Sequence, residues 1–225
     1  MDVAQFEQFV KILHTNLPKF NVKYKDESLF MRLLGTLLFF NADFMSKFST
    51  TIGSTVYLPS RKYVSQHATE AGMILAHEYV HARDANKITG VLFSFLYSFP
   101  QILALLFIAC GFLWWPLFIL ALVMLAPFPA PFRAKLEVRG YTMSLFMYNH
   151  VMKQNNITNE ERKLRLYIDA SHISDNYFKG SMYYKMWPWG VEKKLHNIVD
   201  SIIAEQSINN QYFSEVQHAW DTSLT

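Results

Sequence analysis

The most constraining feature of the sequence is a long stretch without charge in the middle of the chain. No Asp, Glu, Lys or Arg occurs between Lys87 and Arg133. Residues 91–132 are almost entirely apolar, and Gln101 is their only strongly polar side chain. One bilayer span needs about 20 apolar residues, so the stretch is long enough for two short spans. We therefore expect an inserted hydrophobic helical hairpin over about residues 91–130.

The hairpin has a recognisable turn and basic flanks. Gly111, Pro116 and two tryptophans cluster at residues 110–116, which favours a turn there, and Pro100 is expected to kink the first span. The second span, from 117 to about 128, is short. Basic residues flank both ends but not the turn: Arg83, Lys87, Arg133, Lys135 and Arg139. The positive-inside rule then places both ends on the cytoplasmic side of a membrane. Burial of the hairpin in a soluble core or a homo-oligomer is the alternative, which hydropathy does not separate from insertion.

Composition limits the class of protein. A chain of 225 residues predicts one domain, here residues 1–225 with the hairpin inserted. Only 17% of residues are charged, which excludes a disordered chain, and a net charge of +3 gives no reason to expect a nucleic-acid partner. Cys110 is the single cysteine, so neither an internal disulfide nor a thiolate cluster can form. The N-terminal residues lack the apolar core of a secretory signal peptide.

The remaining pattern predicts an α+β fold that is mostly α. Alternating or β-branched segments predict strands at 20–25 and 50–58. Helical periodicity predicts a surface helix over 3–13 and a buried helix over 28–40, capped by Asp26 or Ser28. Further helices are expected at 65–84, 133–152, 158–167 and 191–205, and an irregular aromatic segment at 176–190.

The strongest chemical signal is the HExxH pattern at residues 77–81. On a helix, His77 and His81 lie one turn apart on the same face, where two imidazoles can bind one zinc ion and Glu78 can hold its water. Apolar residues surround the motif, and burying three ionisable groups is costly unless a metal pairs them. The alternative is a coincidental pair of surface histidines.

Zinc requires a third protein ligand and an open position. The downstream candidates are Glu137, His150, Asp169, His172 and Asp175. We favour Glu137, because it lies on an otherwise apolar flank of a predicted helix; the alternative is a surface glutamate paired with Arg133. Asp84 continues the face of His77, so it either orients a ligand imidazole or is a solvated residue of the last turn.

The ligand assignment constrains the hairpin. His77 and His81 precede the uncharged stretch and Glu137 follows it. One ion cannot be bound from both sides of a bilayer, so the stretch must return to the side it left. The predicted hairpin satisfies this requirement.

The order HEYVHARD, hydrophobic insert, LEVRGY resembles the gluzincin metallopeptidases. The insert resembles those of the CAAX prenyl endopeptidase and its bacterial heat-shock relatives. The small size and the segment TTIGSTVYLP resemble the minigluzincins of bacteria and phages. The resemblance covers about residues 50–148 and implies a zincin-like core, with His77, His81 and Glu137 as ligands and Glu78 as the catalytic base. Many gluzincins carry an acidic residue where this chain has Tyr141.

These observations predict a membrane-associated zinc peptidase that acts on a protein or peptide substrate, with its active site on the cytoplasmic side. Zn2+ would activate water, Glu78 would act as general base, and the strand at 50–58 would pair an extended substrate. The candidate oxyanion donors are Tyr141, His172, Tyr183 and Tyr184, although the abundance of aromatic residues in this chain favours a structural role for each. The alternative function is a non-catalytic membrane-interacting protein or a virion or envelope component, in which a closed four-ligand site stabilises the fold.

Overall fold

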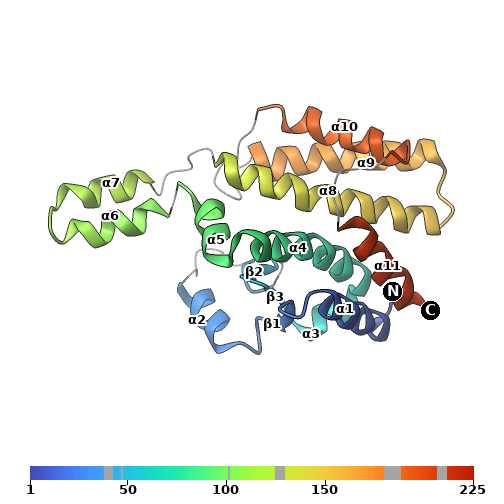
Figure 1. Ribbon diagram of the computed structural model, residues 1–225, viewed down its shortest axis with the longest axis horizontal. Helices are drawn as coiled ribbons and strands as arrows, with labels where there is room; N and C mark the ends of the chain where they lie inside the picture. Colours follow the sequence, from blue (N-terminus) through green and yellow to red (C-terminus); the bar gives the residue numbers. More distant parts are fainter. Residues whose placement is uncertain (38–42, 47, 101, 125–129, 180–188, 207–211) are drawn as a thin grey trace. The chain divides into compact units, whose positions relative to one another are not determined.

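A computed structural model describes residues 1–37, 43–46, 48–100, 102–124, 130–179, 189–206 and 212–225 (Figure 1). This part of the chain is mostly helical with one small sheet, which confirms the predicted α+β, mostly α class. The chain forms two compact units. The first contains Met1–Gly90 and Asn210–Thr225, and the second contains Val91–Asn209. The prediction of a single zincin-like domain stays a prediction.

The first unit combines a small sheet with helices. Its elements are α1 (Val3–Asn16), β1 (Asn21–Tyr24), α2 (Leu29–Leu37), β2 (Thr50–Ile52), β3 (Thr55–Leu58), α3 (Arg61–Gln66), α4 (Ala68–Ile88) and α11 (Phe213–Leu224). The sheet has the order β1-β3-β2, with β1 parallel and β2 antiparallel to β3. Helix α4 packs against β2 and β3, so the predicted HExxH helix lies next to the edge strand β2 (Figure 1).

Two predicted elements of the first unit need a correction of their boundaries, and the predicted cap of a third is confirmed. The segment 50–58 is a hairpin rather than one strand, because Gly53 takes a left-handed φ of 60° and reverses the chain. The helix predicted at 65–84 is interrupted at His67, where α3 ends and α4 begins. Helix α2 begins after Ser28, whose hydroxyl accepts a hydrogen bond from the Met31 N–H, as predicted for its cap.

The prediction that α2 is buried was wrong. Met31 is fully buried, but the other large apolar side chains of its first turns are exposed: Leu29, Phe30 and Leu33. Apolar residues occur all round this short helix, so they cannot all be buried on one side of it. The last residues of the predicted helix, 38–40, lie outside the described residues.

The C-terminal helix α11 completes the core of the first unit, which the sequence did not indicate. The Phe9 and Trp220 rings meet edge to face with centroids 5.4 Å apart. Gly72 of α4 allows close approach, since a Cβ atom there would lie 2.7 Å from the Trp220 ring. Tyr79 donates a hydrogen bond of 2.9 Å to Glu215 of α11. Burial, reinforced by this carboxylate, raises the pKa of Tyr79. The back of the HExxH helix is thereby fixed to α1 and α11.

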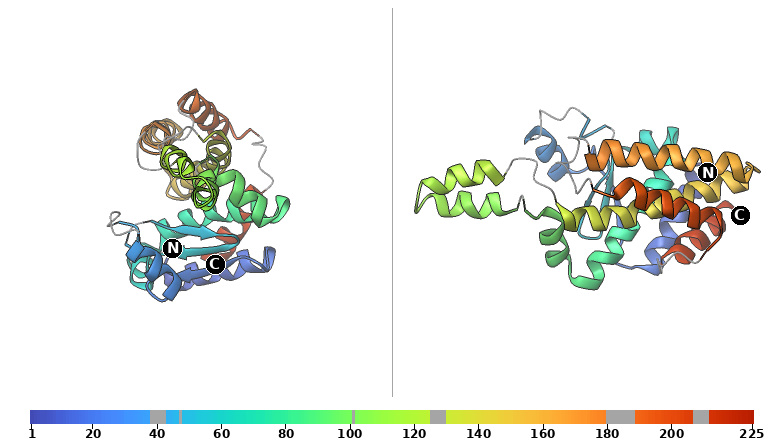
Figure 2. Two further views of the ribbon diagram at one scale, coloured as in Figure 1. Left: turned by 90° about the vertical axis from the view of Figure 1, so that its left-hand side faces the viewer. Right: turned by 90° about the horizontal axis from the view of Figure 1, so that it is seen from above.

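The regular elements in the described part of the second unit are all helices. Its elements are α5 (Gly90–Ser98), α6 (Leu103–Gly111), α7 (Pro116–Met124), α8 (Pro131–Gln154), α9 (Asn159–Ile173), the π-helix η1 (Ser174–Lys179) and α10 (Val191–Ile203). Helices α8, α9 and α10 lie side by side (Figure 2). They share an apolar core that includes Val138, Leu145, Leu166, Leu195 and Val199. Helices were predicted at all three places, whereas η1 replaces the start of the predicted irregular segment 176–190.

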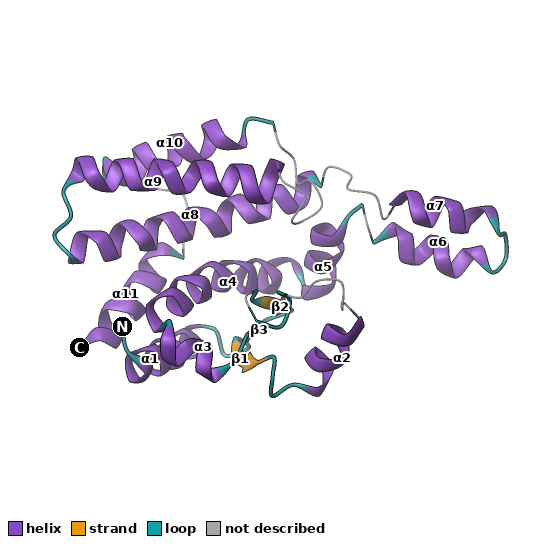
Figure 3. Cartoon of the chain, turned by 180° about the vertical axis from the view of Figure 1, so that it is seen from behind, coloured by secondary structure: helices purple, strands orange, loops and turns teal. Residues whose placement is uncertain are grey.

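The predicted hairpin is present as α6 and α7, which pack along each other and are joined by residues 112–115 (Figure 3). The kink predicted at Pro100 is confirmed, because α5 and α6 meet there at 86°. No single helix in the described residues is both apolar and long enough to cross a bilayer, and only the bent pair α5 and α6 satisfies length and composition together. Residues 125–129, the end of the predicted second span, lie outside the described residues.

Candidate metal centre

The HExxH helix positions its two histidines as the spacing predicted. His77 and His81 lie one turn apart on α4, and their Nε2 atoms are 3.1 Å apart. The ring planes are inclined at 72° with centroids 4.9 Å apart. Two imidazole nitrogens bound tetrahedrally to one zinc ion at about 2.0–2.1 Å would be about 3.3 Å apart. The histidine pair therefore already has nearly the spacing that a shared ion requires.

Both oxygens of Glu78 accept hydrogen bonds from hydroxyl groups on or beside the edge strand β2. Ser49 donates to Oε1 at 3.0 Å, and Thr51 donates to Oε2 at 2.6 Å. These bonds fix the orientation of the carboxylate next to the histidines. Sequence reasoning missed both donors, since nothing in a Ser-Thr-Thr run shows which helix the hydroxyls will face.

A buried lysine lies near the same carboxylate. Lys25, at the end of β1, is 0% exposed, and its Nζ donates a hydrogen bond of 2.6 Å to the Phe44 carbonyl. The ammonium also lies 3.9 Å from the centre of the Phe44 ring. Burial lowers the pKa of Lys25 to about 8, although the negative charge of Glu78 partly opposes this shift. The alternation at 20–25 predicted the strand but not this role for its last residue.

Glu137 lies on α8 in the second unit and is only 7% exposed, so the surface-glutamate alternative is wrong. The Tyr97 hydroxyl of α5 donates a hydrogen bond of 2.5 Å to its Oε1. Arg133 in turn donates from Nε to the Tyr97 carbonyl at 2.7 Å, and its guanidinium lies 5.1 Å from the Tyr97 ring centre. Tyr97 was also missed, because it lies within the uncharged stretch, where we expected only apolar contacts.

His77, His81 and Glu137 form a buried group that can hold a metal ion. One ligand atom from each lies within 4.8 Å of the other two. His81 is 4% exposed, whereas His77 as a whole residue retains intermediate exposure. Among the described residues, the four other candidate ligands do not belong to this group: His150, Asp169, His172 and Asp175. Of these, His172 is exposed and Asp175 pairs with Lys179 at 2.8 Å.

Two further predicted residues have informative surroundings. Asp84 is buried on α4, so the interpretation as a solvated last-turn aspartate was wrong. Its role in orienting a ligand imidazole stays a prediction.

Tyr141 lies one turn after Glu137, and its ring centre is 5.2 Å from that of Tyr177 and 6.0 Å from that of Phe178. Burial raises the pKa of Tyr177, and the charge of Glu137 adds to this effect. The candidates Tyr183 and Tyr184 lie outside the described residues.

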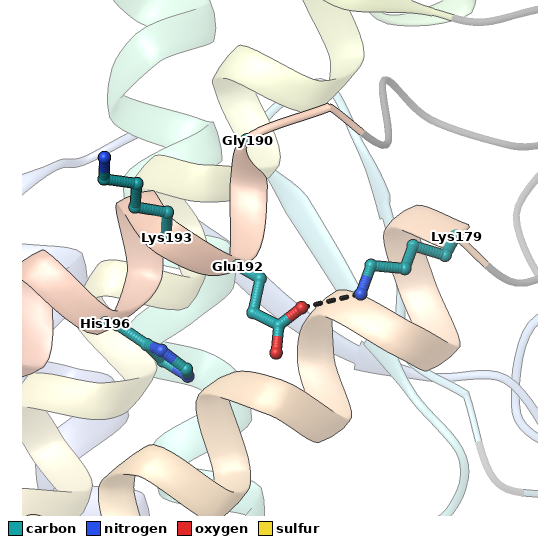
Figure 4. Close-up of a pocket in the computed structure, with 5 residues that line it drawn as sticks. All are labelled: Lys179, Gly190, Glu192, Lys193 and His196. Carbon is teal, nitrogen blue, oxygen red and sulfur yellow. Dashed lines mark hydrogen bonds and ion pairs between the residues drawn. The ribbon is translucent and has the colours of Figure 1, made fainter.

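A separate hollow of about 410 Å³ occurs at the start of α10 (Figure 4). It is lined by Lys179, Gly190, Glu192, Lys193 and His196. Lys179 pairs with Glu192 at 2.6 Å as well as with Asp175, so its charge is already balanced by carboxylates. None of the predicted site residues lines this hollow, and we assign it no function.

Comparison with known proteins gave no match with any family model, curated protein or solved structure.

Proposed function

We propose that the protein is a zinc-dependent peptidase. The observation that carries the proposal is the group formed by His77, His81 and Glu137, with Glu78 directly following the first ligand. Two imidazoles and one carboxylate are a donor set that catalytic zinc sites use, and three protein ligands leave a fourth position for water. The spacing of the two Nε2 atoms and the burial of the group support a metal site over a coincidental histidine pair.

When bound, zinc would lower the pKa of a water molecule from about 15.7 toward 7 and polarise the substrate carbonyl. Glu78 is the general base: its carboxylate takes a proton from the attacking water and delivers it to the leaving amine. Ser49 and Thr51 hold that carboxylate in place. Tyr141, one turn from Glu137, is the proposed donor to the oxyanion of the tetrahedral intermediate.

The substrate is proposed to be an extended peptide. Strand β2 lies at one edge of the described sheet, and its Thr51 contacts Glu78 directly. A peptide that added to this edge as a further strand would pass beside the general base. This placement favours cleavage within a chain over recognition of a free terminus.

The test is to purify the protein, measure bound zinc and compare Glu78→Gln with Glu70→Gln. Glu70 is an exposed residue of the same helix and provides a matched control. Glu78→Gln should retain zinc and lose proteolysis by about 10²–10⁴-fold, as expected for removal of a general base. Glu70→Gln should behave as the wild type. Undiminished proteolysis in Glu78→Gln would refute this residue as the base.

Chelation separates this proposal from a structural metal site in a non-catalytic virion, envelope or membrane-interacting protein. A structural site is closed by four protein ligands, and its loss unfolds the domain. The group in the described residues supplies three ligands, which favours the catalytic alternative. We expect chelation to abolish proteolysis while the far-ultraviolet circular dichroism stays nearly unchanged.

A further inference from the structure

The α6–α7 hairpin has the distribution of side chains typical of a protein surrounded by lipid. Its buried residues are all small: Ala104, Gly111 and Ala121. A Cβ atom at Gly111 would lie 2.9 Å from the Phe118 ring, so the two helices approach closely there. Small residues between helices and large ones outside are the reverse of a soluble core and are characteristic of helix packing within membranes.

The large apolar side chains of the hairpin point outward on all sides. The exposed ones are Leu105, Leu106, Ile108, Phe112, Leu113, Trp114, Trp115, Phe118, Ile119, Leu120, Leu122 and Val123. Residues 102–124 contain no charged side chain. A helix that lies flat on a membrane surface has a polar face, whereas neither α6 nor α7 has one. Full immersion in an apolar medium suits this surface better than a water-facing position.

The turn of the hairpin satisfies its own backbone donors. Four N–H groups in and just after the turn donate to backbone carbonyls at 2.9–3.1 Å: those of Leu113, Trp114, Leu117 and Phe118. Pro116 has no N–H group to satisfy. Backbone donors without partners are the main obstacle to placing a turn in hydrocarbon. The internal bonds remove much of that cost here.

The length of the two helices limits how deeply the hairpin can insert into a bilayer. Each helix has 9 residues. At a rise of 1.5 Å per residue, each is about 14 Å long. The hydrocarbon core of a bilayer is about 30 Å thick, so one leaflet provides about 15 Å.

We propose that the α6–α7 hairpin is a monotopic anchor that inserts, turn first, into a single leaflet of a lipid bilayer. Acyl chains cover its apolar surface, and both ends of the hairpin stay on one face of the membrane. The inference does not depend on the peptidase activity.

Flotation of the full chain with phosphatidylcholine vesicles tests binding. The wild type should float with the vesicles at both low and high salt, since the binding surface has no charge. Leu122→Lys, at a position 69% exposed on α7, should lower the partition coefficient by about 100-fold. Leu164→Lys, at a position 62% exposed on α9, is the matched control and should float like the wild type. Wild-type protein that stays with the unbound fraction, or equal flotation of Leu122→Lys, overturns the proposal.

Cysteine labelling tests the depth. In the double variant Cys110→Ala, Leu113→Cys, the one thiol lies in the turn, at a position 90% exposed. A membrane-impermeant maleimide should label it without vesicles. When vesicles are present, neither reagent added outside nor reagent trapped inside should label the thiol. Lipids brominated near the acyl-chain ends should quench the fluorescence of Trp114 and Trp115 most strongly.

Three results would contradict this assignment. Labelling from the trapped reagent would show that the turn crosses the bilayer. Equal labelling from outside with and without vesicles would show that the hairpin does not insert. Protection without vesicles would show that another copy of the chain covers the hairpin.

Discussion

Helix α4 and the α6–α7 hairpin depart from the usual distribution of residues in opposite ways. Helix α4 buries ionisable side chains, including His81 and Asp84, among apolar neighbours. The hairpin exposes its leucines and tryptophans and buries alanine and glycine. Buried polar groups and exposed apolar patches are the two departures that carry information about function, because ordinary folding avoids both. These two departures support the proposals of a bound ion in the first region and of a lipid environment for the second.

The largest effect that separates the two regions should come from truncating one leucine in each. Leu75 of α4 is fully buried, so Leu75→Ala should lower the free energy of unfolding by about 2–5 kcal/mol. Leu105 of α6 is exposed, and Leu105→Ala should change the free energy of unfolding by no more than about 0.5 kcal/mol. Urea unfolding followed by circular dichroism measures both. A large loss in Leu105→Ala would show that the hairpin is covered by protein, and the contrast would disappear.

The burial of polar groups around α4 can be tested further at Lys25, whose charge interacts with that of Glu78. Its pKa is about 8 in the folded protein and about 10.5 when unfolded. The unfolded state binds more protons between these values, so stability rises with pH from about 8 to 10.5, and the cost of burying the charge is fully present below pH 8. Lys25→Met removes this cost. The amount by which its free energy of unfolding exceeds that of the wild type should therefore shrink by about 3 kcal/mol between pH 7 and pH 10.5.

Urea unfolding at a series of pH values tests this prediction. Lys23→Met, at an exposed position of the same strand, is the control and should show no such pH dependence. The Lys25→Met variant also leaves the Phe44 carbonyl without its donor, which adds a constant offset. An advantage that is constant or grows with pH would contradict the burial argument.

A smaller effect is expected at Tyr97, the polar residue of the uncharged stretch that contacts Glu137. Tyr97→Phe removes the hydroxyl that orients the carboxylate, and the zinc affinity should fall by about 10–100-fold. Competition with a chromophoric chelator measures this change. Tyr167→Phe is the control, because Tyr167 also bonds a carboxylate, that of Asp200, which is not part of the metal group. Unchanged affinity in Tyr97→Phe would remove Tyr97 from the description of the site.

Local patterns were sufficient for much of the fold and for the three residues of the candidate metal group. The helix around His77 and His81, the helix carrying Glu137 and the hairpin with its break at Pro100 were all predicted from spacing, charge and proline chemistry. These features depend on residues within a few turns of one another. The predictions failed where an element had to be placed against others: α2 is exposed, and the segment 50–58 is a hairpin.

The sequence by itself determined that two histidines share a helical face and that residues 88–132 carry no charge, because both statements depend only on chain order and helical periodicity. Only the tertiary structure decided which groups surround Glu78 and Glu137. Lys25, Ser49 and Thr51 are separated from Glu78 by tens of residues, and Tyr97 is likewise distant from Glu137. Hydrogen bonds and burial of this kind depend on how distant segments fold together, and no local pattern contains that information.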